Sequence, residues 1–97
     1  MLKKQNLKSK PVCKVTFEVS PSSEVGQVFL VGDFNGWDQA ATPMKRFKGG
    51  RFKVVLELDS NREYQFRYLA GGIWFNDDAA DKYVMNEFGE DNSVVTT

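Results

Sequence analysis

The sequence predicts an all-β chain that folds as an antiparallel immunoglobulin-like β-sandwich, and three observations support this. Apolar and polar residues alternate with a period of two in several short segments, Gly and Asn clusters separate them, and no segment carries a sustained helical period. Short strands at regular spacing are typical of two antiparallel sheets packed face to face. The length of 97 residues suits one such domain.

The first expected strand alternates Cys13, Val15 and Phe17 with polar residues, so one of its faces is expected to be buried. Residues 25–32 form a nearly continuous apolar run, which favours a central strand covered on both faces. Residues 33–44 are expected to form a long loop. A strand over 51–58 then follows a Gly-Gly turn and directs four residues inward, namely Phe52, Val54, Leu56 and Leu58.

Residues 63–70 are expected to form a strand with Tyr64, Phe66 and Tyr68 on the core face. Gly71-Gly72 is a favoured hairpin turn, and it fixes the register of the next strand. In that register Ala70 lies opposite Ile73, Leu69 opposite Trp74, and Tyr68 opposite Phe75. The core face therefore receives Phe75, and the outer face receives Trp74, diagonally near Arg67.

The ends of the chain carry weaker patterns. Residues 1–11 are polar and lysine-rich, so they are expected to be a flexible lead-in to a single domain over 12–97. The lysines fit a solvated segment, with binding to RNA or an anionic surface as the alternative. Residues 76–89 are acidic and irregular, with a helical turn expected over 79–83. Residues 93–97 are expected to form the last strand.

Composition argues against an enzyme. The chain has no histidine, so it lacks a His-based triad and the usual zinc ligands, and its single cysteine is expected to be a buried hydrophobe. Carboxylates flank a sugar in glycosidases, and two pairs come into question, Asp77 with Asp78 and Glu87 with Glu90. Their local spacing favours a solvated loop instead. No cofactor or metal is expected.

The zero net charge argues against nucleic acid as a partner, and no run of apolar residues is long enough to span a membrane. A reduced, cytoplasmic location is the resulting expectation.

Two tryptophans suggest sugar recognition. Trp37 stands in a turn after an apolar strand, and Trp74 is expected on an outer sheet face. An exposed indole is a flat apolar plate that stacks on a pyranose ring, and a helical α-glucan offers both an apolar face and hydroxyl groups. The alternative for Trp37 is packing over the end of a sheet, and the alternative for Arg67 is an ordinary cross-strand ion pair.

Several motifs agree in order and spacing with a known family. They are Gly32-Asp-Phe-Asn-Gly-Trp37 after an apolar strand, Tyr64-Gln-Phe-Arg-Tyr68, the run from Gly71 to Asp77, and the segment from Asn86 to Val95. In these motifs the chain resembles the family 48 carbohydrate-binding module, also called the isoamylase N-terminal or early-set domain. The glycogen-binding domain of the AMP-activated protein kinase β subunit belongs to this family, as do N-terminal domains of branching and debranching enzymes.

The resemblance implies a set of site residues. Trp37 and Trp74 would be stacking platforms, Arg67 stands where glycogen-binding members have a lysine, Phe88 where they have a leucine that touches the ligand, Glu90 where they have a threonine, and Asn92 at an asparagine that bonds to hydroxyls. Arg67 keeps a donor but changes its reach, and Glu90 adds a carboxylate to the site.

The leading functional hypothesis is non-catalytic binding of α-glucans of the glycogen or starch type, alone or as a targeting module for a glucan-processing enzyme or kinase complex. The alternative is a protein-interaction or spacer domain associated with a glycoside hydrolase, without sugar binding. A third interpretation is a fragment of a glycoside hydrolase whose catalytic residues lie outside these 97 residues.

Overall fold

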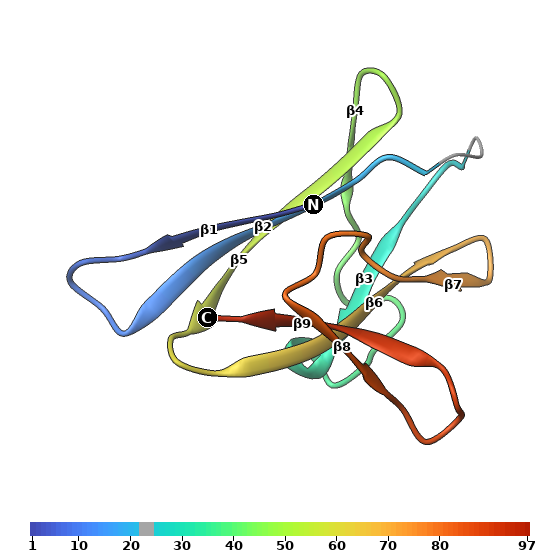
Figure 1. The fold of residues 1–97 in the computed structure, drawn as a ribbon. Helices are drawn as coiled ribbons and strands as arrows, with labels where there is room; N and C mark the ends of the chain where they lie inside the picture. The colour runs from blue at the N-terminus through green and yellow to red at the C-terminus, as the bar shows by residue number, and fades with distance from the viewer. Residues whose placement is uncertain (22–24) are drawn as a thin grey trace.

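The computed structural model describes residues 1–21 and 25–97, and it shows two antiparallel sheets that pack face to face (Figure 1). One sheet has the strand order β1-β2-β5-β4, and its strands in that order span Leu2–Asn6, Val12–Val19, Arg51–Asp59 and Lys45–Phe47. The other has the order β3-β6-β9-β8, spanning Phe29–Gly32, Glu63–Ala70, Asp91–Thr96 and Lys82–Met85, with β7 (Ile73–Phe75) also paired to β6. The predicted all-β sandwich is confirmed. No helix in the described residues is long and apolar enough to cross a membrane.

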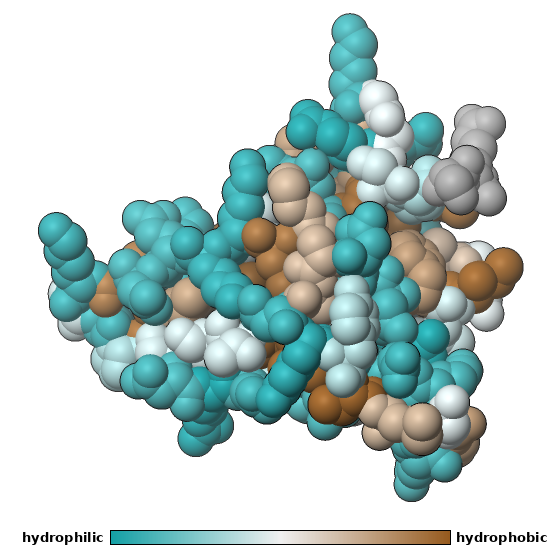
Figure 2. Space-filling view, viewed as in Figure 1, coloured by the Kyte–Doolittle hydropathy of each residue, from teal (hydrophilic) through white to brown (hydrophobic). Residues whose placement is uncertain are grey.

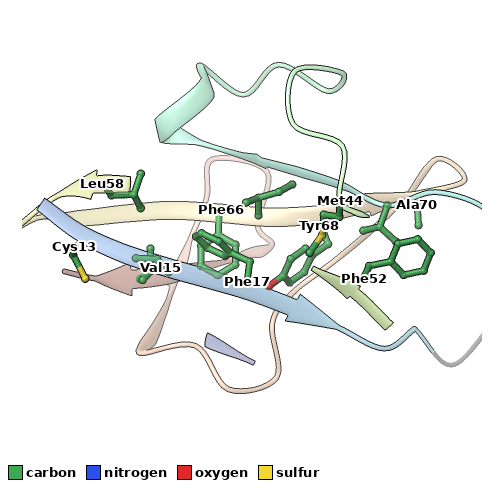
Figure 3. Close-up of a cluster of buried hydrophobic side chains, with 12 residues drawn as sticks. Cys13, Val15, Phe17, Met44, Phe52, Leu58, Phe66, Tyr68 and Ala70 are labelled. Carbon is green, nitrogen blue, oxygen red and sulfur yellow. The ribbon is translucent and has the colours of Figure 1, made fainter. Parts of the chain in front are cut away.

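The core lies between β2 and β6, whose inward side chains meet in the middle of the sandwich (Figure 3). The rings of Phe17 and Phe66 meet edge to face with their centroids 5.1 Å apart, and Phe66 meets Tyr68 in the same way at 5.7 Å. This geometry is favoured by the aromatic quadrupole. The period-two alternation that the sequence shows in both strands therefore corresponds to the observed buried faces, and the expected burial of Cys13 is confirmed.

The hairpin register read from Gly71-Gly72 is also confirmed. Ala70 pairs with Ile73, Leu69 with Trp74, and Tyr68 with Phe75. Phe75 packs against the core, with its ring centroid 5.4 Å from that of Tyr68.

The expectation that residues 25–32 form a central strand is wrong. β3 begins at Phe29 and lies at the edge of its sheet, paired along its length with β6. Val28 and residues 30–32 of this run are buried nonetheless, and the chain that leads to β4 covers the outer edge of β3. The Leu30 amide donates to the Thr42 carbonyl at 2.9 Å, and the Met44 amide donates to the Val28 carbonyl at 2.8 Å. Covering an edge in this way satisfies its free backbone groups.

The lead-in expected over residues 1–11 differs from the structure, which pairs β1 with β2 from Leu2 opposite Phe17 to Asn6 opposite Cys13. Residues 2–6 thus extend the first sheet. All of β1 after Leu2 is exposed, so its composition resembles that of a linker although its backbone is paired. Figure 2 shows hydrophilic residues over most of the arm that this hairpin forms at the left of the view.

The acidic segment after β7 differs from expectation in two ways. Residues 82–85 form the edge strand β8 where a helical turn over 79–83 was expected, because mostly exposed side chains give this short strand little apolar pattern. Asp77, expected in a solvated loop, is buried, with 2% of its surface exposed, whereas Asp78 is exposed.

Hydrogen bonds compensate the burial of Asp77. Its Oδ2 accepts from the Tyr68 hydroxyl at 2.7 Å and from the Met1 ammonium at 2.9 Å, and its Oδ1 accepts from the Ala79 amide at 2.8 Å. Its own amide donates to the Ser93 hydroxyl at 3.0 Å. A buried carboxylate is tolerated when its oxygens are bonded in this way. Asp77 therefore joins β6, β9 and the N-terminus of the chain.

Gly32 should not tolerate a side chain. Its φ of −173° is ordinary extended backbone, but an added Cβ would lie 2.6 Å from the Gln65 carbonyl oxygen and 2.8 Å from the Phe66 Cβ. Gly32→Ala is expected to lower the free energy of unfolding by about 1–3 kcal/mol, because β3 must move away from β6. Urea denaturation followed by circular dichroism measures the change. The matched control is Gly26→Ala, where a Cβ meets nothing within 4 Å among residues 1–21 and 25–97. Equal effects of the two substitutions would contradict the close approach.

Burial, followed by the charge of Asp77 and the hydrogen bond to it, raises the pKa of Tyr68 far above its usual value. The hydroxyl is therefore expected to stay protonated in the folded protein at pH 11. Stability should be unaffected by this group below about pH 10 and should fall above it, because only the unfolded chain releases the proton there. Absorbance at 295 nm, which rises when tyrosines ionise, tests this. If Tyr68 stays protonated, Tyr68→Phe should leave the rise in absorbance of the folded protein at pH 11 unaltered. A smaller change in the variant would contradict the expectation.

Candidate functional site

The turn after β3 is built by Asn35 and two residues with positive φ. The 3₁₀ turn η1 (Asp33–Asn35) leads to Gly36 and Trp37, whose φ angles are 65° and 60°. The Asn35 side chain accepts from the Gly32 amide at 3.1 Å and donates to the Leu30 carbonyl at 2.9 Å, which closes the turn onto β3. A positive φ is easy for glycine and strained for tryptophan. Such strain is found at functional sites.

Asp33 holds this strained turn against β6. Its Oδ1 accepts from the Trp37 indole nitrogen at 2.9 Å, and its Oδ2 accepts from the backbone amide of Gln65 at 2.7 Å. The Trp37 amide also donates to the Gly32 carbonyl at 2.9 Å. Trp37 is thus held beside β6 by hydrogen bonds from its backbone amide and from its ring nitrogen.

Neither tryptophan belongs to the core cluster of the described residues. The turn supplies Phe34 to the core instead, where its ring centroid lies 5.6 Å from that of Phe17. Trp37 and Trp74 are both half-buried. Trp37 thus lies outside the core cluster, and whether it covers the end of the sheet, as the alternative proposed, stays a prediction.

An open pocket of about 590 Å³ lies over the outer face of β6. Ligand-binding pockets commonly have volumes of about 300–1,000 Å³. All six residues named from the sequence line it, and five further residues complete the lining. The full set is Asp33, Trp37, Gln39, Gln65, Arg67, Trp74, Asn86, Glu87, Phe88, Glu90 and Asn92. Two aromatic plates and several amides and carboxylates thus surround one space.

Arg67 stands between Trp74 and Glu90. Its guanidinium carbon lies 5.9 Å from the centroid of the Trp74 ring, within cation–π range, and its Nη1 lies 3.5 Å from the Glu90 carboxylate. The Arg67 side chain is 13% exposed, whereas that of Glu90 is 55% exposed. The buried Nε of Arg67 has no hydrogen-bond partner among the described residues. Arg67 thus forms an ion pair inside the pocket with a residue of the turn before β9, whereas the alternative expected for it was a pair with a residue of a neighbouring strand.

Asn92 is the most buried of the six site residues predicted from the sequence. It is 6% exposed, its Nδ2 donates to Gln65 Oε1 at 3.0 Å, and its Oδ1 accepts from Asn86 Nδ2 at 3.1 Å. Asn86 in turn accepts from the Phe88 and Glu90 amides at 2.9 and 3.1 Å. This chain of amides fixes the turn between β8 and β9 against β6. Phe88, at the tip of that turn, is 81% exposed.

The six site residues named from the sequence leave out five that line the pocket, namely Asp33, Gln39, Gln65, Asn86 and Glu87. Gln65 shares its strand face with Arg67, so the period-two alternation was a signal that would have found it. For Asp33 the signal was weaker, because its distance to the Trp37 indole depends on a turn conformation that residue order does not specify.

Comparison with protein families gives one match. The model of carbohydrate-binding module 48, described as the isoamylase N-terminal domain, matches residues 9–91. The chain belongs to this family. The match places the chain among carbohydrate-binding modules with an immunoglobulin-like fold. A search of curated proteins found no match.

The range that matches the family model includes most of the candidate site of this carbohydrate-binding module. Five of the six sequence-derived site residues lie within it, and Asn92 lies one position beyond its end. The strands β1 and most of β9 also lie outside the match.

The Asp33 carboxylate offers a direct test of how this module holds Trp37. Asp33→Asn is expected to lower the free energy of unfolding by about 1–2 kcal/mol. The asparagine has one oxygen and one NH₂ group, so its NH₂ must face either the Trp37 indole N–H or the Gln65 backbone N–H, and one hydrogen bond is lost. The emission of Trp37 should change as its nitrogen loses its acceptor. Urea denaturation and tryptophan fluorescence provide the measurements. Glu57→Gln, an equivalent change at an exposed residue on β5, is the control, and identical behaviour of the two variants would contradict the role of Asp33.

Proposed function

We propose that this module binds α-glucan chains of the glycogen or starch type in the pocket over β6. The observation that carries the proposal is the pair of indoles outside the core, Trp37 and Trp74, which line the same pocket. An apolar plate in an open pocket suits the flat face of a pyranose ring. Membership of a carbohydrate-binding family supports a sugar as the ligand.

Polar groups around the plates supply hydrogen bonds for hydroxyls. Arg67 donates and Glu90 accepts. Gln65 and Asn92 retain donor and acceptor capacity beyond the bonds that they make, and Asn86 retains one donor. The exposed ring of Phe88 provides a third apolar contact at the rim. A few placed polar groups among apolar surfaces are typical of ligand recognition.

A binding role without catalysis fits the same pocket. Catalysis by a glycosidase pair needs an acid with a raised pKa opposite a second carboxylate. Glu90 is mostly exposed and paired with Arg67, while Asp77 is buried and bonded within the fold. We propose that the module targets a glucan-metabolising partner to its substrate.

Affinity electrophoresis tests the proposal. Glycogen in the gel should retard the protein, and barley β-glucan, which differs in linkage, should leave its mobility unchanged. Trp74→Ala is expected to weaken binding at least tenfold, because a stacking platform is lost. Ile73→Ala is the matched control, since Ile73 is the preceding residue of β7, is 69% exposed and does not line the pocket.

Unchanged mobility in glycogen, or equal retardation of the two variants, would overturn glucan binding at this pocket. Titration with β-cyclodextrin followed by tryptophan fluorescence gives an independent measurement, since both indoles lie in the pocket.

A protein-interaction role is the second candidate. Ile73 and Met85 are 69% and 74% exposed, and such large apolar side chains also suit a protein partner. The double substitution Ile73→Ala and Met85→Ala separates the two roles. It should leave glucan binding intact in either case, and it should weaken a stoichiometric protein complex only if these residues form an interface.

A further inference from the structure

The pocket carries more negative than positive charge. Asp33, Glu87 and Glu90 contribute three carboxylates, and among the described lining residues Arg67 is the one cation. Hydrogen bonds from Trp37 and Gln65 occupy the oxygens of Asp33 without cancelling its charge. A bound group in this space therefore meets an excess of two negative charges.

Arg67 alone would be a good receptor for a phosphate ester. A guanidinium binds phosphate through two parallel hydrogen bonds, and it does so more strongly when it is partly withdrawn from water. The Arg67 side chain is 13% exposed, and its guanidinium carbon lies 5.9 Å from the centroid of the Trp74 ring in the pocket, so the group is available for such contact. Its charge is already matched, however, by the Glu90 carboxylate 3.5 Å away.

The Arg67–Glu90 pair suits an uncharged ligand. The pair offers a donor and an acceptor side by side, and neighbouring hydroxyls of a sugar ring each donate and accept. A phosphate on the same ring would have to displace Glu90 from Arg67, and it would add negative charge to a pocket that Asp33 and Glu87 also line. Repulsion between like charges is appreciable near a protein surface.

We propose that Glu90 makes this pocket selective for uncharged glucan chains over chains that carry phosphate. The inference rests on the proposed function and adds a specificity-determining residue to it. Glu90 acts by neutralising Arg67 and by leaving the pocket with excess negative charge.

Binding of three cyclodextrins to the full chain tests the inference. They are β-cyclodextrin, its neutral hydroxyethyl ether as a control for bulk, and the derivative with phosphate on every primary hydroxyl. In low salt the phosphate derivative should bind about tenfold more weakly than the ether, and the difference should shrink at 0.5 M NaCl, because screening weakens the repulsion. Isothermal titration calorimetry or tryptophan fluorescence measures each affinity.

Two variants separate the effect of the pocket's negative charge from the effect of freeing Arg67 from its ion pair with Glu90. Glu90→Gln should raise about tenfold the ratio of the affinity for the phosphate derivative to the affinity for β-cyclodextrin. Glu87→Gln removes the same charge without freeing Arg67, so its gain should be several-fold smaller. Both residues are exposed, so neither substitution is expected to affect folding.

The outcomes are distinguishable. Equal binding of the ether and the phosphate derivative would overturn the selectivity and leave glucan binding intact. Equal gains from Glu90→Gln and Glu87→Gln would overturn the role of Glu90. Failure of β-cyclodextrin itself to bind would overturn the proposed function, and the selectivity with it.

Discussion

The packing of Tyr64, Phe66 and Tyr68 against the core is the constraint on which the rest of the molecule depends. Because side chains of a strand alternate between two faces, burying these three aromatic residues forces Gln65 and Arg67 onto the opposite face. The pocket is assembled on that face. A slip of one residue in β6 would exchange the core and pocket residues, so stability and the site share one register.

Segments distant in sequence reach the pocket by bonding to β6. The turn after β3 is held by Asp33 on the Gln65 amide, β7 is held by the hairpin register, and the turn between β8 and β9 is held through Asn92 on the Gln65 side chain. Phe88, at the tip of the turn between β8 and β9, is therefore held at the rim of the pocket by the bonds of Asn86 and Asn92. The strained φ of Trp37 is maintained because Asp33 and the Gly32 carbonyl both restrain it.

Much of the fold was predictable from residue order because local rules govern it. Strand alternation in β2, β5 and β6 and the hairpin turn at Gly71-Gly72 depend on neighbours in sequence, and they correctly placed Trp74 opposite Leu69. The same rules failed where partners are distant. β1 and β8 have mostly exposed side chains and exist because a neighbouring strand pairs with them, and β3 is buried because residues 42–44 cover its edge.

The features of the candidate site also fall into those that the sequence predicts and those that depend on the tertiary structure. Sequence by itself determined the strand faces, the outward position of Trp74 and, through the family motif, the six predicted site residues that line the pocket. Only the tertiary structure decided that Glu90 meets Arg67 over Trp74, that Asp33 restrains Trp37, and that Asp77 is buried beneath Tyr68. The physical reason is that alternation and turn preference act between sequence neighbours, whereas charge pairing and hydrogen bonding depend on distances that exist only once the two sheets have packed.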